Sequence, residues 1–233
     1  AVHEQSVHKR PAGGPVGRFR QDGMRDQPVT ARTAIADVTS RDDPIKGTLL
    51  RPGRKGATLW FTGLPSAGKS TIAHALAEQL HTAGERVQVL DGDEVRPHLS
   101  AGLGFSREDR DINVTRIGWV ARMLASHGVI VLVPVIAPYA EARDAVRDDH
   151  DRVAVPFAEV HVATPLEIAE ARDVKGLYAR ARSGELRGLT GVDDPYEVPT
   201  QAELVVDTGS VDLETAVQMS KALLSAIVER DLR

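Results

Sequence analysis

The chain has 233 residues and no cysteine. That absence excludes disulfide bridges, zinc sites built on thiolates and cysteine nucleophiles. Aromatic residues make up only 4% of the chain, and no apolar run reaches the roughly 18 residues of a membrane-spanning helix. The first residues also lack the apolar core of a secretion signal. We therefore expect a cytoplasmic protein with no membrane partner.

The charge balance gives no general sign of nucleic-acid binding. The net charge is −4, from 29 basic and 33 acidic residues, so any basic site must be local. A hydrophobic content of 42% suits one globular domain with a sizeable core. Residues 1–50 are rich in Arg, Gly and Pro, and we expect a partly flexible N-terminal arm there. A docking or regulatory role for this arm is the alternative.

Residues 51–233 read as an α/β domain, because apolar strand-like runs alternate with helical patterns. The expected strands lie in "ATLWFTG", "RVQVLDGD", "VIVLVPVIAP", "FAEVHVAT" and "AELVVDT". Several are apolar throughout, which predicts a parallel sheet covered by helices on both faces. In the helix expected from 108 to 128, we predict that Ile112, Ile117, Val120 and Leu124 are buried. Residues 173–200 read as a mobile loop.

The segment Gly63-Leu-Pro-Ser-Ala-Gly-Lys-Ser70 fits the P-loop pattern and lies between an expected strand and helix. Backbone amides at the start of such a helix face an anion, and the helix dipole favours negative charge there. Lys69 is expected to reach the outer phosphates, and the Ser70 hydroxyl to bind Mg²⁺. The alternative is an ordinary glycine-rich turn with a surface lysine. The predicted ATP site comprises Gly63, Leu64, Pro65, Ser66, Ala67, Gly68, Lys69, Ser70 and Thr71.

Two carboxylates, Asp91 and Asp93, follow the second expected strand. Strand ends form the ligand crevice of an open α/β sheet, so both should lie beside the P-loop. There they suit a metal shell, with Asp91 as a ligand, and a base for an attacking hydroxyl. An Asp-Gly turn without a chemical role is the alternative. No Asn-Lys-x-Asp segment for guanine occurs, which favours a kinase over a GTPase.

Several further segments occur in a fixed order: "GLGFSREDRDINVTRIGWVA", "APYAEAR" and "RDVKGLYARARSGELRGLTGVDDPYEVP". Together with the P-loop and "LDGDEVR", they resemble the adenylylsulfate kinase family over about residues 50–233. The resemblance implies a P-loop kinase that uses ATP and Mg²⁺ to phosphorylate the 3′-hydroxyl of adenylyl sulfate. It also implies a cytoplasmic homodimer and allows association with an ATP sulfurylase.

The resemblance also implies the acceptor site. Arg96, Arg110 and Lys175 match positions that hold the acceptor, and arginine forks suit its oxyanions. Without the resemblance, the arginines would suit a solvated helix face and Phe105 a core position. Arg172 matches a position near the ATP base, and residues 173–200 become a lid that excludes water. The implied acceptor residues are Asp93, Arg96, Phe105 (stacking on adenine), Arg110, Asn113 (a hydrogen bond), Ile136, Ala137, Lys175, Leu177 and Leu189.

Three residues depart from the family pattern. Ala137 replaces a frequent serine, which excludes a phosphoserine at this position and predicts direct transfer. Leu189 replaces a lid phenylalanine that would stack on adenine opposite Phe105, and Ala140 replaces a frequent arginine. These departures leave open a related kinase for another nucleotide or a specialised metabolite. A non-catalytic nucleotide-binding partner is a third hypothesis.

Overall fold

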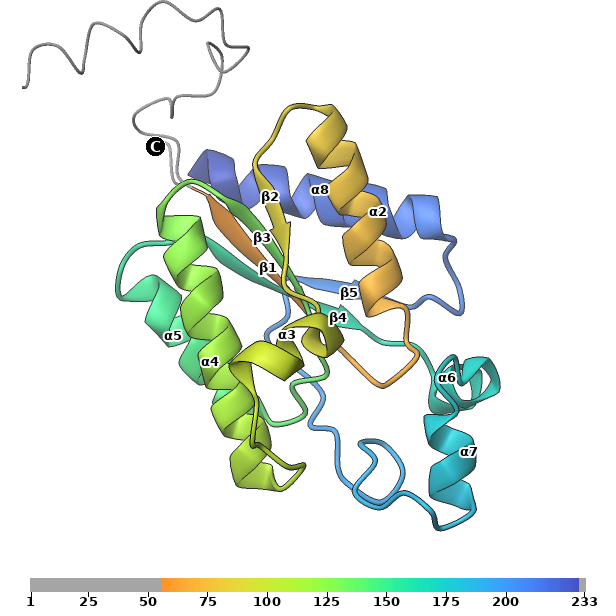
Figure 1. Ribbon diagram of the computed structural model, residues 1–233. Coiled ribbons are helices and arrows are strands. Elements are labelled where there is room, and N and C mark those ends of the chain that lie inside the picture. The colour runs from red at the N-terminus through yellow and green to blue at the C-terminus, as the bar shows by residue number, and fades with distance from the viewer. Residues whose placement is uncertain (1–55, 231–233) are drawn as a thin grey trace, which may run out of the picture. The chain divides into compact units, whose positions relative to one another are not determined.

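The computed structural model describes residues 56–230, so the predicted arm at residues 1–50 lies outside the described part of the chain. Five strands form one sheet in the order β2-β3-β1-β4-β5 (Figure 1). Every pairing in this sheet is parallel, which confirms the predicted α/β class. The strands are β1 (Ala57–Thr62), β2 (Val87–Val89), β3 (Ile130–Pro134), β4 (Phe157–Val162) and β5 (Leu204–Val206).

Helices cover both faces of the sheet. Figure 1 shows α2 and α8 on one face and α4 and α5 on the other, while α6 and α7 lie beyond the sheet. Within residues 56–230, no helix is both long enough and apolar enough to cross a membrane. The helices are α2 (Lys69–Thr82), α3 (Gly92–Leu99), α4 (Arg107–Ser126), α5 (Ala140–Asp151), α6 (Leu166–Arg172), α7 (Leu177–Arg182) and α8 (Leu213–Arg230).

Every residue of the central strand β1 is buried, because alternate side chains of this strand point into the cores on the two faces of the sheet. Leu59 and Phe61 pack with Ile72 of α2 on one face. Trp60 points to the opposite face and packs in the core that contains Ile117 of α4. All five of these side chains are essentially inaccessible to solvent.

The buried face of α4 differs from the predicted one. Ile117 is buried as expected, but Ile112 is 42% exposed, and Val120 and Leu124 are only partly buried. Small residues face inward instead, because α4 packs closely against α5: a Cβ on Gly118 would lie 2.6 Å from a Val146 methyl carbon. The residues that form the buried face are Val114, Ile117, Gly118, Ala121 and Ala125.

Two short helices were not predicted. The Asp91 carboxylate caps α3 by accepting a hydrogen bond from the Asp93 amide at 2.9 Å. Within the expected loop at 173–200, Asp173 accepts hydrogen bonds from the amides of Tyr178 and Ala179 and so starts α7. Side-chain capping of this kind is a local signal that apolar periodicity does not reveal.

Candidate active site

A cavity of about 760 Å³ opens at the carboxyl ends of the strands. In parallel α/β sheets this edge is where ligands bind. The cavity is lined by the start of α2, by α3 and the start of α4, by the loop after β3, and by parts of residues 172–190. It therefore brings the P-loop and the segments that carry the family resemblance into one space.

The P-loop joins β1 to α2 in a backbone shape that its glycines permit. Gly63 and Gly68 have φ values of 151° and 103°, and a Cβ on Gly63 would lie 2.5 Å from the Val162 carbonyl oxygen. The first turn of α2 begins at Lys69 directly after this loop. Amides in a first helical turn lack partners within the helix, so they are available to an anion.

The Lys69 side chain folds back across the P-loop. Its ammonium group donates hydrogen bonds to the carbonyls of Gly63 at 2.9 Å and Leu64 at 2.7 Å. Burial lowers the pKa of Lys69 from 10.5 to about 7, although the Asp91 carboxylate opposes that shift. Lys175 lowers the pKa slightly further. A cation held only by carbonyls in a buried place is ready for an anionic ligand.

The two predicted carboxylates have different surroundings. Asp91 is only 6% exposed, and its second oxygen lies 3.9 Å from the His74 ring nitrogen Nε2. The Asp93 side chain is 69% exposed and forms an ion pair with Lys175. Among residues 56–230, no cluster of three or more His, Asp or Glu side chains could hold an ion. Any cation here would need ligands from a bound nucleotide as well.

Phe105 lies on the surface of the cavity, and the residue is 63% exposed. The Arg96 guanidinium lies 4.1 Å from the ring centroid, and the Arg110 guanidinium lies 5.9 Å from it. Asn113, one helical turn further along α4, accepts a hydrogen bond from Ser100. Phe105 thus borders the cavity instead of packing in the core, and its predicted stacking on adenine stays a prediction.

Arg110 is more engaged within the protein than we expected. It donates hydrogen bonds to the Phe105 carbonyl at 2.8 Å, to the Thr190 hydroxyl at 2.6 Å and to the Gly188 carbonyl. Its guanidinium also lies 3.7 Å from Asp194. Arg110 therefore ties α4 to residues 188–194, a contact that sequence spacing could not reveal.

The remaining predicted acceptor residues also border the cavity. Ala137 is buried and has a left-handed backbone with φ of 43°. Leu189 is 7% exposed and packs with Ala169 and Tyr178 in a small apolar cluster at α6 and α7. Three predicted P-loop residues are not part of the cavity lining: Gly63, Leu64 and Ala67. The predicted residues in the lining are Pro65, Ser66, Gly68, Lys69, Ser70, Thr71, Asp91, Asp93, Arg96, Phe105, Arg110, Asn113, Ile136, Ala137, Arg172, Lys175, Leu177 and Leu189.

Thr208 is a cavity residue that the sequence reading missed. Arg172 donates hydrogen bonds to its hydroxyl at 2.7 Å and to its carbonyl at 2.8 Å. The Thr208 hydroxyl in turn donates to the Ala67 carbonyl of the P-loop at 3.0 Å. Thr208 follows β5 by two residues, so the rule that strand ends line the crevice could have identified it.

Comparison with known proteins gives a consistent result. Residues 55–207 match the family model described as adenylylsulphate kinase. A protein of Picosynechococcus sp. named adenylyl-sulfate kinase is 54% identical over 164 residues, which is 70% of this chain and 90% of the relative.

Solved structures agree with the sequence matches. The APS kinase of Mycobacterium tuberculosis in complex with AMPPNP and APS has a TM-score of 0.72 at 42% identity, covering 74% of this chain and 99% of that chain. A hexameric APS kinase from Thiobacillus denitrificans has a TM-score of 0.56 at 40% identity, covering 74% of this chain and 29% of that chain.

Proposed function

The chain belongs to the adenylylsulphate kinase family. We propose that the cavity at its strand ends binds both substrates of an adenylyl-sulfate kinase, ATP and adenylyl sulfate. The protein is an adenylyl-sulfate kinase, which transfers the γ-phosphate of ATP to the 3′-hydroxyl of adenylyl sulfate. The products are ADP and 3′-phosphoadenylyl sulfate, and the hydroxyl proton is released. The observation that carries the site assignment is that the P-loop and Phe105 border one continuous cavity.

The donor site lies at the P-loop. ATP phosphates would accept hydrogen bonds from the first-turn amides of α2, and the Lys69 ammonium would leave the Gly63 and Leu64 carbonyls to contact them. Arg172 and Thr208 border the same end of the cavity and support its assignment to the nucleoside side of ATP.

The residues beside the P-loop also fit Mg²⁺ bound together with ATP. Ser70 is the second residue of α2. The Asp91 carboxylate oxygen that does not cap α3 lies 3.9 Å from the His74 Nε2 atom. A hydroxyl and one carboxylate, with waters and phosphate oxygens, form the octahedral oxygen shell that Mg²⁺ prefers. When bound, the ion would neutralise charge on the transferred phosphoryl group.

The acceptor site lies at the other end of the cavity, around Phe105. Adenine would stack on its exposed ring, while Arg96 contacts the phosphate or sulfate and Asn113 hydrogen-bonds the nucleotide. The Asp93 carboxylate would accept the proton of the attacking 3′-hydroxyl, because it lines the cavity and, unlike Asp91, is not used to cap α3. Ala137 cannot carry a phosphoryl group, so transfer proceeds directly between the two substrates.

Residues 173–200 would act as a lid over both substrates. Gly176 and Gly184 flank α7 with left-handed backbones, which suits a hinge, and Lys175 and Leu189 of this segment line the cavity. A homodimer is supported by an exposed apolar stripe on α4, formed by Ile112, Trp119 and Met123 at helical spacing.

An acceptor panel tests this assignment most directly. ADP release would be measured with adenylyl sulfate, adenosine 5′-phosphate and unrelated nucleotides at saturating ATP. We expect turnover with adenylyl sulfate and loss of it in Lys69→Ala. Turnover with another acceptor and none with adenylyl sulfate would contradict the proposed function.

A further inference from the structure

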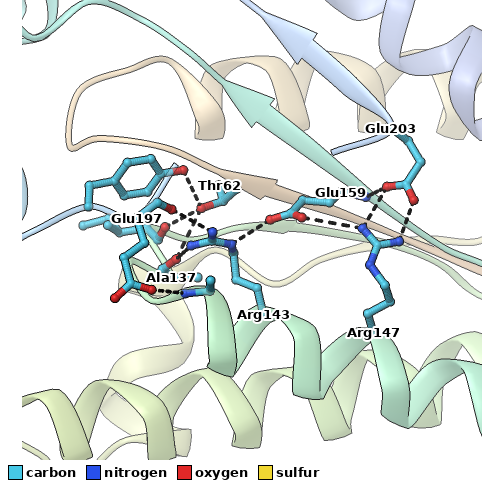
Figure 2. Close-up of polar contacts among 10 residues, drawn as sticks. Thr62, Ala137, Arg143, Arg147, Glu159, Glu197 and Glu203 are labelled. Carbon is cyan, nitrogen blue, oxygen red and sulfur yellow. Dashed lines mark hydrogen bonds and ion pairs between the residues drawn. The ribbon is translucent and has the colours of Figure 1, made fainter. Parts of the chain in front are cut away.

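A buried arginine of α5 joins two separate parts of the cavity surroundings. Arg143 is only 3% exposed, and its guanidinium donates a hydrogen bond to the Ala137 carbonyl at 2.8 Å. A second nitrogen donates to the Glu197 carbonyl at 2.7 Å. Figure 2 shows this side chain reaching from α5 toward both carbonyls. One rigid, planar group thus fixes two backbone segments that are 60 residues apart.

Both segments belong to the proposed site. Residues 135–138, here named the acceptor wall, line the cavity beside the position proposed for adenylyl sulfate. Glu197 lies near the end of the proposed lid, and its amide donates to the Pro138 carbonyl at 2.8 Å. The Glu197 carboxylate also accepts a hydrogen bond from the Ala140 amide at 2.7 Å. The lid end is therefore held against the acceptor wall next to Arg143.

The acceptor wall needs such support because its backbone is unfavourable. Ala137 has φ of 43°, a conformation that costs a non-glycine residue roughly 1–2 kcal/mol. Thr62, at the end of β1, supplies a second support by donating to the Ile136 carbonyl at 2.6 Å. The Tyr196 hydroxyl lies 3.0 Å from the Thr62 hydroxyl, so this contact also reaches the lid end.

Neutralising the buried Glu159 carboxylate does not by itself account for the hydrogen bonds that Arg143 makes. The Arg143 Nε atom lies 2.8 Å from the buried Glu159 carboxylate of β4, an ion pair without the alignment of a hydrogen bond. Arg147 also contacts Glu159, at 3.5 Å, and is shared with Glu203. Burial raises the pKa of Glu159, and the two guanidiniums oppose that shift. Of the two arginines, Arg143 and Arg147, only Arg143 also reaches the acceptor wall (Figure 2).

We propose that Arg143 and Thr62 are positioning residues that hold the acceptor wall and the lid end in the geometry that binds adenylyl sulfate. This inference rests on the proposed acceptor site. Neither side chain touches a substrate in this role. Each acts through the backbone of Ile136 and Ala137. Removing its hydrogen bond should therefore weaken binding of the acceptor more than binding of ATP, which we place at the opposite end of the cavity.

Arg143→Lys tests the proposal, with Arg147→Lys as the matched control. Lysine keeps the positive charge near Glu159 but cannot bridge two carbonyls and a carboxylate with one planar group. We expect Arg143→Lys to raise the KM for adenylyl sulfate about tenfold or more, with the KM for ATP changed less than about twofold. Arg147→Lys should leave both KM values within about twofold while lowering Tm to a similar extent.

Thr62→Val provides a second test that does not remove a charge. It should also raise the KM for adenylyl sulfate selectively, and it keeps the proposal testable if Arg143→Lys does not fold. Equal changes in both KM values, or an equal effect of Arg147→Lys, would show a merely structural role and overturn the proposal. If the unmodified protein does not turn over adenylyl sulfate, the proposed function fails, which is a different result from an unaffected Arg143→Lys enzyme.

Discussion

The Arg96 guanidinium lies 4.1 Å from the centroid of the Phe105 ring, yet Phe105 remains 63% exposed. A cation on one side of an exposed aromatic ring holds the ring in place and contributes roughly 0.5–1 kcal/mol at such a site. The remaining surface of the ring is free for a flat ligand. The pair therefore places a stacking surface next to a group that binds oxyanions, which matches the two chemical parts of adenylyl sulfate.

Phe105→Ala should chiefly weaken acceptor binding. Loss of one base–aromatic stack, worth roughly 1–3 kcal/mol, predicts a KM for adenylyl sulfate raised about fivefold to 150-fold. The KM for ATP should stay nearly constant, because Phe105 is assigned to the acceptor and not to ATP. Steady-state kinetics with each substrate varied in turn measure both values. Phe105→Tyr should retain near-normal binding, and an unchanged KM in Phe105→Ala would reject the stacking role.

ATP binding should be coupled to protonation of Lys69. Burial lowers the pKa of Lys69 to about 7 in the ligand-free protein, and bound phosphates would raise it again. Between these two pKa values the free protein holds fewer protons than the complex, so binding takes up a proton. We expect uptake approaching one proton at about pH 8.5, measured by calorimetry in buffers of different ionisation enthalpy.

Lys69→Met is the control for this uptake, since it removes the titrating group while keeping much of the apolar stem. Equal proton uptake in Lys69→Met would mean that another group takes up the proton.

The lowered pKa of Lys69 also affects folding stability. Between pH 7 and the unfolded pKa of 10.5, the unfolded chain binds more protons than the folded protein. Stability should accordingly rise with pH in that interval, and Lys69→Met should flatten the rise.

The sequence predicted the parallel sheet and the P-loop well because both depend on local chemistry. The apolar run at β1 and the two glycines of the P-loop each correspond to one backbone requirement. The P-loop residues and the two carboxylates border one cavity for a similar reason: they follow strand ends that must meet at one edge. The other predicted acceptor residues came from the family resemblance.

The failures came from packing and from long-range hydrogen bonds. The predicted buried face of α4 included Ile112, whereas close approach of α5 brings Gly118 inward. The hydrogen bonds of Arg110 to Gly188 and Thr190, about 80 residues away in the chain, could not be predicted from the sequence either, and its role in holding the acceptor stays a prediction. No period or motif within one segment carries that information.

Gly118→Ala should test the close packing of α4 against α5. The added Cβ would lie 2.6 Å and 2.9 Å from the two Val146 methyl carbons, and a valine buried at 4% exposure cannot move aside freely. Overpacking of this kind costs roughly 1–3 kcal/mol of unfolding free energy, even though alanine favours helix by nearly 1 kcal/mol.

Urea unfolding followed by circular dichroism measures this change. Thr115→Ala, at an exposed position of the same helix, is the control and should leave stability nearly unchanged. A Gly118→Ala protein more stable than the parent would mean that α4 and α5 are not this close. Kinetic constants should change little in either variant, because Gly118 does not border the cavity.

Leu189→Phe tests one of the three departures from the family pattern, the leucine that stands where the family has a lid phenylalanine. Leu189 borders the cavity while its other side packs with Tyr178 and Ala169. A phenyl ring at this position would present an aromatic face to adenine opposite Phe105, and part of a 1–3 kcal/mol stack predicts a KM for adenylyl sulfate lowered roughly threefold to tenfold. Leu189→Met, which changes shape without adding a ring, should leave that KM close to the parent value. If both variants raise the KM alike, position 189 serves the packing of α6 and α7 and does not contact the acceptor.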